Sequence, residues 1–400
     1  MDDCDQNCGV TAPSKRSAIV SKPVTAPVWF CTSVGGGVFG EGQTAAWRGF
    51  GLDARLHYSV DVADYWRAKS SVWTRLRLRW SMYVSYPFGL WRAVLRARPG
   101  EIFVAVTNPF FLPALATHAA RRSGAKIVHL VYDLYPDALI FGGGWSMKHP
   151  AARFAAHTTQ MAIRNCSATV YLGERLRQHA ESRYGVARRT AVIPVGTDAA
   201  VFEGSEPAAR EQGMVRCLYS GHLGMLHEWE TLRNALASGV PDRVAIEIAA
   251  DGPGATALKQ QLAAVAAREP GRLLFAGTRG NAEWKSAMLS ADVALVTMRP
   301  GAEKVVMPSK TYSAMAAGQA VLAVCPRGSD LADLIALHDC GWVIEPGDVE
   351  GLRSRLESLP GAPGEILEKR RNAWKAAHEH YSMNAAGWYW KELLESLDGP

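Results

Sequence analysis

The chain has 400 residues, of which 48% are hydrophobic and 20% charged; this predicts two or three domains and excludes a globally disordered or collagen-like chain. Its charge is unevenly distributed, because residues 1–195 hold 24 Lys and Arg against 12 Asp and Glu, whereas residues 196–400 hold 20 against 26. The basic half predicts a negatively charged neighbour, such as a membrane surface, a nucleic acid or a phosphorylated substrate.

Residues 1–27 are rich in Asp, Ser, Thr, Pro and Lys and lack the apolar run of a signal peptide, so they predict a disordered leader. The leader contains Cys4 and Cys8, but no second Cys or His pair follows closely, so an unstructured tail is favoured over a zinc site. The seven cysteines are odd in number and fall mostly in apolar runs, which favours a reducing cytoplasmic compartment. The longest uncharged window, residues 102–120, is interrupted by prolines, so no membrane-spanning helix is expected.

Short β-branched runs alternate with longer helical stretches, which predicts two parallel α/β domains. The N-terminal domain spans residues 28–200, with strands expected at 28–32, 102–106, 126–132, 168–171 and 191–193 and helices near 112–123, 150–165 and 173–183. Residues 201–213 are polar and predict the linker. The C-terminal domain spans residues 214–380, with strands expected at 215–219, 244–249, 273–276, 293–297, 320–324 and 342–344. A final helix is expected at residues 381–400; an ordinary amphipathic packing helix explains it, and the family resemblance described below equally implies that it crosses back to the N-terminal domain.

Residues 65–98 hold eight Lys and Arg, eight aromatic residues and no Asp or Glu. Interleaved cations and aromatic rings suit a lipid headgroup region, where aromatic rings occupy the interface and cations meet anionic lipid. An anionic membrane surface is therefore the favoured partner, ahead of a helix pair with its tryptophans in the core and of single-stranded nucleic acid. The residues of this membrane and acceptor segment are Arg75, Arg77, Arg79, Trp73, Trp80 and Trp91.

In doubly wound sheets, ligands bind beyond the carboxyl ends of the strands, so the loops after the predicted strands are the candidate functional segments. The loop of residues 34–42 is rich in glycine, and its Gly36 and Gly37 let backbone N–H groups approach a phosphate or sugar closely. Its spacing also matches a dinucleotide fingerprint, but the acidic residue expected about 20 residues later is ambiguous. A plain tight turn remains the alternative.

The loop of residues 219–224 opens the C-terminal domain and contains Gly221, His222, Leu223 and Gly224. We expect its glycines to hold an anion at the N-terminus of a helix that starts near His227, where backbone N–H groups are unpaired. A lone histidine is more often surface or core filler, so His222 gains weight only because it flanks the glycines. Two later segments, with Asp251 and Gly252 and with Thr278 and Arg279, are ordinary turns when each is taken alone.

Residues 306–318 predict a short helix that begins at Pro308 and Ser309 and ends at Gly318. Lys310 lies in its first turn, where a cation costs about 0.3–1 kcal/mol against the helix dipole. A bound diphosphate would reverse the sign of that interaction. A solvated lysine is the alternative explanation.

Together these segments resemble the GT-B glycosyltransferases of family 4, especially the branch that builds bacterial surface polysaccharides. The resemblance rests on the order of Val131-Tyr-Asp-Leu-Tyr-Pro136, Tyr219-Ser-Gly-His-Leu-Gly224, Asp251-Gly-Pro253, Ser290-Ala-Asp-Val-Ala-Leu295, Pro308-Ser-Lys-Thr-Tyr with Met315-Ala-Ala-Gly318, and Pro346-Gly-Asp348. It implies an α/β protein with two Rossmann-like, doubly wound parallel-sheet domains facing a central cleft.

The resemblance further implies transfer of a sugar from a nucleotide-diphosphate donor to a lipid-linked or glycan acceptor in bacterial polysaccharide biosynthesis, with retention of anomeric configuration. No metal and no cofactor are expected, and the only D-x-D in the sequence, Asp3-Cys4-Asp5, lies in the leader. The co-substrate is expected to be a UDP-sugar ahead of a GDP-sugar. The expected location is cytoplasmic, peripheral at the inner face of the plasma membrane, with no nucleic acid partner.

Asp133, Lys310 and His222 are the catalytic candidates that this resemblance implies. Lys310, His222 and the loop glycines would stabilise the leaving diphosphate, and Gly36 and Gly37 would close from the other domain. Asp133 would face the donor sugar or acceptor hydroxyl, although capping of the next turn explains it nearly as well. The donor-binding candidates are Gly36, Gly37, Gly221, Leu223, Gly224, Asp251, Gly252, Thr278, Arg279, Pro308, Ser309, Thr311 and Ser313.

The sequence departs from the family pattern in the region where members usually carry two glutamates eight positions apart. Val305 and Ser313 occupy those positions, and Glu303 lies two residues away from the first. Ser313 is still able to form a hydrogen bond with a ribose hydroxyl. These departures leave two alternatives open, a catalytically inactive accessory or binding subunit and a sugar-nucleotide epimerase. The intact glycine loops and Lys310 favour the transferase.

Overall fold

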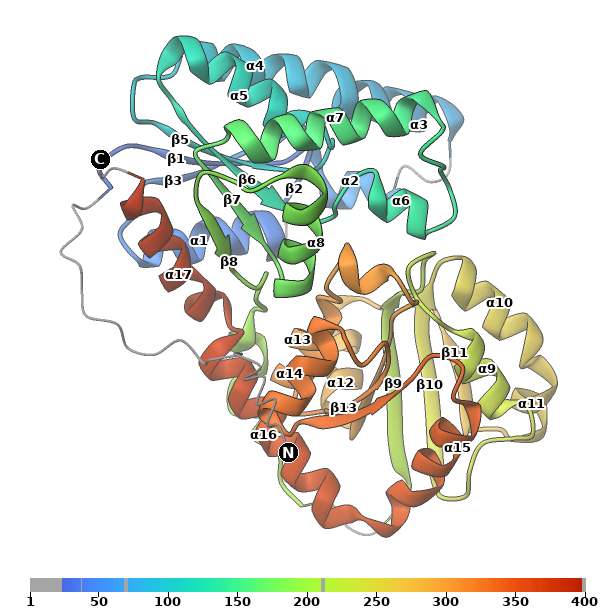
Figure 1. Cartoon of the computed structure of the whole chain (residues 1–400). Helices are drawn as coiled ribbons and strands as arrows, with labels where there is room; N and C mark the ends of the chain where they lie inside the picture. The colour runs from blue at the N-terminus through green and yellow to red at the C-terminus, as the bar shows by residue number, and fades with distance from the viewer. Residues whose placement is uncertain (1–23, 37, 68–70, 210–212, 398–400) are drawn as a thin grey trace, which may run out of the picture.

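The computed structural model describes residues 24–36, 38–67, 71–209 and 213–397. Cys4, Cys8, the D-x-D and the candidate Gly37 lie outside the described residues. The expected leader extends too far, because Val24 is buried in the core and the carbonyl of Pro27 accepts a hydrogen bond of 3.1 Å from the Ile102 backbone N–H. The two α/β domains lie one above the other in Figure 1, with the N-terminal domain at the top.

The N-terminal domain is built on a six-stranded parallel sheet with the strand order β3-β1-β5-β6-β7-β8. All five residues of β5 are buried, as expected for a parallel sheet that is covered on both faces. The strands are β1 (Val28–Cys31), β3 (Ala54–His57), β5 (Ile102–Val106), β6 (Lys126–Val131), β7 (Ala168–Tyr171) and β8 (Thr190–Val192). The sequence predicts all of them except the edge strand β3, and it also misses the short pair β2 (Val34–Gly35) and β4 (Val60–Asp61).

The edge strand β3 escaped prediction because it is short and alternates polar with apolar residues, so it lacks the apolar run of a buried strand. The helices of this domain are α1 (Gln43–Gly49), α2 (Val62–Arg67), α3 (Val72–Trp80), α4 (Tyr86–Leu95), α5 (Leu112–Ser123), α6 (Asp137–Phe141), α7 (Pro150–Asn165) and α8 (Glu174–Tyr184). Two π-helical segments, η1 (Val38–Gly42) and η3 (Ser81–Ser85), adjoin α1 and α4.

The C-terminal domain repeats this architecture with the strand order β11-β10-β9-β12-β13-β14. Its strands are β9 (Val215–His222), β10 (Val244–Asp251), β11 (Leu273–Ala276), β12 (Val293–Thr297), β13 (Ala320–Val324) and β14 (Gly341–Ile344). Its helices are α9 (Glu230–Leu236), α10 (Pro253–Gln261), α11 (Ala263–Arg268), α12 (Asn281–Ser290), α13 (Lys310–Ala316), α14 (Asp330–His338), α15 (Val349–Ser358) and α16 (Pro363–His380). All six strands lie where the sequence predicts them, although β9 and β10 extend further.

The longer β9 corrects the interpretation of the second glycine loop. Gly221 and His222 belong to the strand and pair with Ala250 and Asp251 of β10. The following helix, α9, begins at Glu230 and not near His227. Gly221 therefore lies in a paired strand, and Gly224 opens a turn, closed by a 3.1 Å hydrogen bond from the His227 N–H to its carbonyl, that comes before the helix begins.

The last helix, α17 (Met383–Ser396), leaves the C-terminal domain and packs against α1 (Figure 1). Trp390 is 2% exposed, and its ring lies 5.0 Å from that of Trp47. The five described cysteines are free and buried. Across the described part of the chain, every helix is too short or too polar to cross a membrane.

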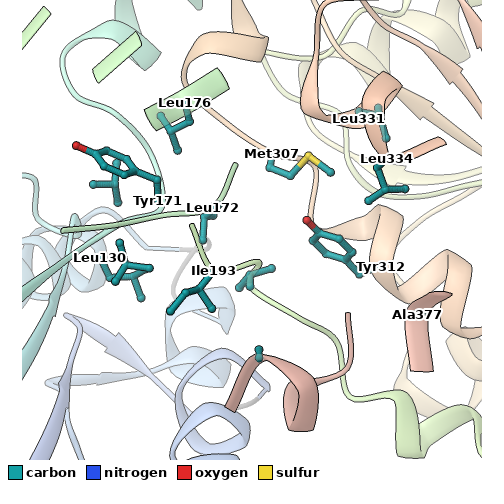
Figure 2. Close-up of a cluster of buried hydrophobic side chains, with 14 of the residues drawn as sticks. Leu130, Tyr171, Leu172, Leu176, Ile193, Met307, Tyr312, Leu331, Leu334 and Ala377 are labelled. Carbon is teal, nitrogen blue, oxygen red and sulfur yellow. The ribbon is translucent and has the colours of Figure 1, made fainter. Parts of the chain in front are cut away.

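The two domains share one continuous hydrophobic core. Figure 2 shows Leu172, Leu176 and Ile193 of the N-terminal domain beside Met307 and Tyr312 of the C-terminal domain. Apolar burial of this kind stabilises by about 25 cal/mol per Å² removed from water, so this contact favours one arrangement of the domains.

A carboxylate also caps a helix across this interface. Asp330, in the first turn of α14, accepts hydrogen bonds from the backbone N–H groups of Glu174 at 2.9 Å and Arg175 at 3.1 Å. These groups open α8 and have no partner within their own helix. A Cβ atom at Gly173 would lie 2.2 Å from the Asp330 carboxylate, so glycine is needed for the close approach.

We predict that Asp330→Ala lowers the free energy of unfolding by about 1 kcal/mol, because a lost helix cap typically costs 0.5–2 kcal/mol. Urea denaturation measures this change. Glu350→Gln, an exposed acid in the first turn of α15, is the matched control and should leave stability unchanged. Equal stability of Asp330→Ala and the control would show that the cap contributes nothing to domain association.

Candidate functional site

A cavity of about 400 Å³ lies between the domains, where the carboxyl ends of strands from both sheets meet. The sequence candidates that line it are Asp133, Gly221, His222, Pro308, Ser309, Lys310 and Ser313. A second cavity of about 300 Å³ shares Gly221 and His222 with the first, so the two adjoin. The second cavity brings in the candidates Asp251, Thr278 and Arg279 together with Trp284.

Lys310 is the cation of the first cavity and lies in the first turn of α13, as the sequence predicts, although the helix begins at Lys310 itself. Its ammonium donates hydrogen bonds to the Tyr219 hydroxyl and, at 3.0 Å, to the His222 carbonyl. It also lies 4.2 Å from the centre of the Tyr219 ring. Burial lowers the pKa of Lys310 to about 7, and the negative charge of Asp251 opposes that shift. An incoming anion would favour the charged ammonium.

His222 is held by a carboxylate and lies between two glycines. Its Nδ1 lies 2.7 Å from Oδ1 of Asp251, an arrangement that β9–β10 pairing dictates because the two residues are register partners. A Cβ atom at Gly224 would lie 2.7 Å from the His222 ring, and so would one at Gly252, where φ is +100°. These two candidates therefore make room for the imidazole, and His222 remains exposed at the mouth of both cavities.

His227 also lines the first cavity, but it is uncharged there. Its Nδ1 donates a 2.9 Å hydrogen bond to the carbonyl of Thr297. Burial and the positive charge of Lys310 lower the pKa of His227 to about 3. The neutral ring therefore offers Nε2 as an acceptor and adds no positive charge to the site.

Asp133 enters the first cavity from the N-terminal domain, directly after β6. Its backbone N–H donates a 3.3 Å hydrogen bond to the hydroxyl of Thr107, which follows the neighbouring strand β5. Burial raises the pKa of Asp133 to about 6. A carboxyl group with this pKa is able to exchange a proton near neutral pH.

The region without the two family glutamates has a defined structure. Ser313 exchanges a 3.0 Å hydrogen bond with the hydroxyl of Thr197, which crosses from the end of the N-terminal domain. Val305 is fully buried, and Glu303 turns back to accept a 2.6 Å hydrogen bond from the Gly301 backbone N–H. Neither Val305 nor Glu303 lines the cavities described above, so Glu303 does not take the place of a family glutamate in this structure.

Several donor-binding candidates do not face the cavities. Thr311 is 0% exposed and Leu223 is 1% exposed, because both side chains point into the C-terminal domain. Gly36 has a φ of +82° and approaches Asp61, away from the residues that line the cavity.

Arg279 lines the second cavity but forms an ion pair with Glu247, so part of its charge is already neutralised.

The structure adds residues that the sequence did not single out, of which Tyr219 and Thr197 matter most. Tyr219 is the partner of Lys310, and Thr197 is the partner of Ser313. Thr197 lies in the loop after β8. Since ligands bind beyond the carboxyl ends of strands, this position was the feature of the sequence that could have identified Thr197 as a site residue. In the described ranges no group of three His, Cys, Asp or Glu side chains is arranged to hold a metal ion.

We predict that Lys310→Met changes stability in a pH-dependent way. Because the folded pKa of about 7 lies below the ordinary value of 10.5, the unfolded wild-type chain binds one more proton between these values. Wild-type stability should therefore rise relative to Lys310→Met as pH increases from 7 towards 10, as urea denaturation at pH 6.5 and 9.5 would measure. The exposed Lys304→Met is the control, and a pH-independent difference would contradict burial of the ammonium.

Comparison with known proteins identifies each of the two domains as a glycosyltransferase domain. The Glycosyltransferase Family 4 model matches residues 45–201, and the model Glycosyl transferases group 1 matches residues 214–360. The probable glycosyltransferase WbjE of Pseudomonas aeruginosa is 24% identical over 292 residues, which cover 68% of this chain and 72% of that protein.

Two solved structures resemble this one over nearly the whole chain. HepE of Anabaena in complex with UDP and glucose has a TM-score of 0.68 at 15% identity and covers 93% of this chain and 100% of its own. Sucrose-phosphate synthase of Thermosynechococcus elongatus has a TM-score of 0.67 at 14% identity and covers 93% of this chain and 99% of its own. The expected GT-B fold is thereby confirmed, and the chain belongs to the family 4 glycosyltransferases.

Proposed function

We propose that this glycosyltransferase moves a sugar from a UDP-sugar to a hydroxyl of a lipid-linked or glycan acceptor in bacterial polysaccharide biosynthesis. The observation that carries the proposal is that Lys310 and His222 of one domain and Asp133 of the other line a single cavity. Glycosyl transfer is promoted by positive charge and hydrogen-bond donors at the leaving diphosphate and by a base that accepts the acceptor's proton. HepE was solved in complex with UDP and with UDP-glucose, which supports a uridine nucleotide as the donor.

In the proposed reaction the diphosphate lies against Lys310 and the exposed edge of His222. The acceptor oxygen bonds to the anomeric carbon while the bond from that carbon to the phosphate oxygen breaks, and the diphosphate leaves with the electron pair. The Lys310 ammonium stabilises the charge that develops on this leaving group, and Asp251 orients His222 for the same purpose. Ser313 binds a ribose hydroxyl in place of the absent glutamate.

Asp133 accepts the proton of the acceptor hydroxyl in this proposal. Its partial burial supports the role, because a pKa of about 6 leaves a carboxylate at neutral pH that still has appreciable affinity for a proton. Family membership is the support for retention of anomeric configuration and for a reaction without metal. The basic N-terminal half supports a place at the inner, cytoplasmic face of the plasma membrane, where the acceptor would be found.

We predict that UDP raises the melting temperature of the wild-type protein with EDTA present, that GDP has a smaller effect, and that Lys310→Ala abolishes the UDP effect. A ligand at 100 times its Kd stabilises the folded state by about 2.7 kcal/mol, which thermal shift detects readily. Lys304→Ala is the control and should respond like wild type. If neither nucleotide shifts the melting curve at millimolar concentration, the proposal fails and the non-catalytic accessory subunit becomes the favoured alternative.

We predict that Asp133→Asn lowers kcat by about 10²–10⁴-fold while the UDP-induced thermal shift is retained. The measurement is UDP release from the UDP-sugar, with a membrane lipid extract as the source of acceptor. Since burial raises the pKa of Asp133 to about 6, the wild-type rate should increase as pH rises through 6, whereas the residual rate of the variant should not. Asp53→Asn, at an exposed ion pair, is the control. An unchanged kcat in Asp133→Asn would remove this residue from the mechanism.

A further inference from the structure

Residues 72–95 form one continuous helix whose two halves have different surroundings. The helical φ and ψ angles continue through Trp80, Ser81, Ser85 and Tyr86, so α3, η3 and α4 run on without a break. The C-terminal half buries Tyr86, Leu90 and Val94, and α4 packs on α5. The N-terminal half, α3, has no buried residue at all.

The exposed half carries a row of large apolar side chains on one face. Trp73, Leu76, Trp80 and Val84 are spaced by three, four and four residues, which places them on the same side of a helix. Trp73 is 81% exposed and Trp80 is 65% exposed. Single exposed apolar residues are ordinary, but a contiguous apolar face on a folded protein marks an interaction surface.

The charge around this face identifies the partner. Arg75, Arg77 and Arg79 are all exposed and interleave with the apolar row, and residues 65–98 contain no Asp or Glu. Tryptophan beside arginine suits the boundary between lipid headgroups and acyl chains, and each cation near an anionic surface strengthens binding about fivefold. A helix of this kind lies in the plane of the interface without crossing it.

Trp91, which the sequence grouped with this surface, belongs elsewhere. It is half-buried against the core cluster that contains Tyr86 and Leu90, and its ring stacks on Phe88 at 5.9 Å. The exposed apolar row therefore continues past Val84 to Phe88, which is 55% exposed, and ends before Trp91.

We propose that the apolar face of residues 72–84 docks in the plane of an anionic phospholipid bilayer and presents the acceptor side of the cavity to that bilayer. The part of this inference that concerns the acceptor rests on the proposed function. The docking residues are Trp73, Leu76, Trp80 and Val84, with Arg75, Arg77 and Arg79 at the headgroups.

A cluster of aromatic rings lies beside the segment that carries Asp133. Tyr83 is on the helix next to Val84, and Tyr135 follows Asp133 by two residues. Burial raises the pKa of Tyr135, and the negative charge of Asp133 raises it further. The Phe110 ring lies 5.8 Å from the Tyr135 ring.

The test is co-flotation of the purified full chain with vesicles of phosphatidylcholine containing 30% phosphatidylglycerol, and with vesicles of phosphatidylcholine alone. Wild type should float with the anionic vesicles and bind neutral vesicles far more weakly, and added salt should weaken its binding. The variant R75E/R77E/R79E should bind at least about a hundredfold more weakly, since three contributions of about fivefold are lost. K259E/R268E/R327E, with the same charge change at exposed sites of the C-terminal domain, should bind like wild type.

A second pair of variants separates apolar insertion from charge. W73S/W80S should lose vesicle binding, while Trp388→Ser, at a 46% exposed tryptophan of α17, should retain it. Binding of R75E/R77E/R79E at wild-type level, or failure of wild type to float with anionic vesicles, overturns the proposal. It is equally overturned if sedimentation shows a concentration-dependent dimer that W73S/W80S abolishes, because the face would then join two copies of this chain.

The docking variants must also be tested for the UDP-induced thermal shift, which they should keep. The thermal-shift and vesicle-binding measurements together distinguish failure of the donor site from failure of the docking surface. If wild type floats with anionic vesicles but shows no shift with UDP, the docking surface stands and the donor site fails. If UDP shifts the melting curve but no vesicle binds, the donor site stands and the docking surface fails.

Discussion

The apolar contact between the two domains is the constraint on which the rest of the structure depends. The side chains of Leu172, Leu176 and Ile193 bury against Met307 and Tyr312, and Asp330 caps the first turn of α8 from the other domain. This contact brings the carboxyl ends of two separate sheets to the same place. Without it, residues of one domain would have no defined distance from residues of the other, and no cavity would lie between them.

The partly buried ammonium of Lys310 destabilises the empty cavity but favours binding of an anion there. Its hydrogen-bond partners are a phenol and a carbonyl, which do not carry a compensating negative charge, so burial lowers its pKa to about 7. A group of this kind destabilises the empty protein and favours an anionic ligand, which restores the charge balance. The same environment also lowers the pKa of His227, and at about 3 this ring stays neutral.

Most of the fold follows from the sequence because buried parallel strands have a strong local signature. β5 is apolar throughout and β12 is apolar up to its last residue, Thr297, so the positions of both strands are predicted closely. The edge strand β3 and the two-residue strands β2 and β4 carry no such signature. The candidate site is predicted less completely. Asp133, His222 and Lys310 do meet, but Thr311 and Leu223 turn into the core, since adjacent residues of a helix or loop cannot all face one cavity.

The sequence by itself determined the class of the protein, the two parallel α/β domains and the loops at which a ligand would bind, because these depend on local periodicity and on residue types in a fixed order. Only the tertiary structure decided that His222 is a strand residue paired with Asp251, that Ser313 bonds to Thr197 and that the exposed apolar row ends before Trp91. These facts depend on register and on contacts between residues far apart in the chain. Local periodicity carries no information about them, because it is the same for a helix that is buried and for one that is left uncovered.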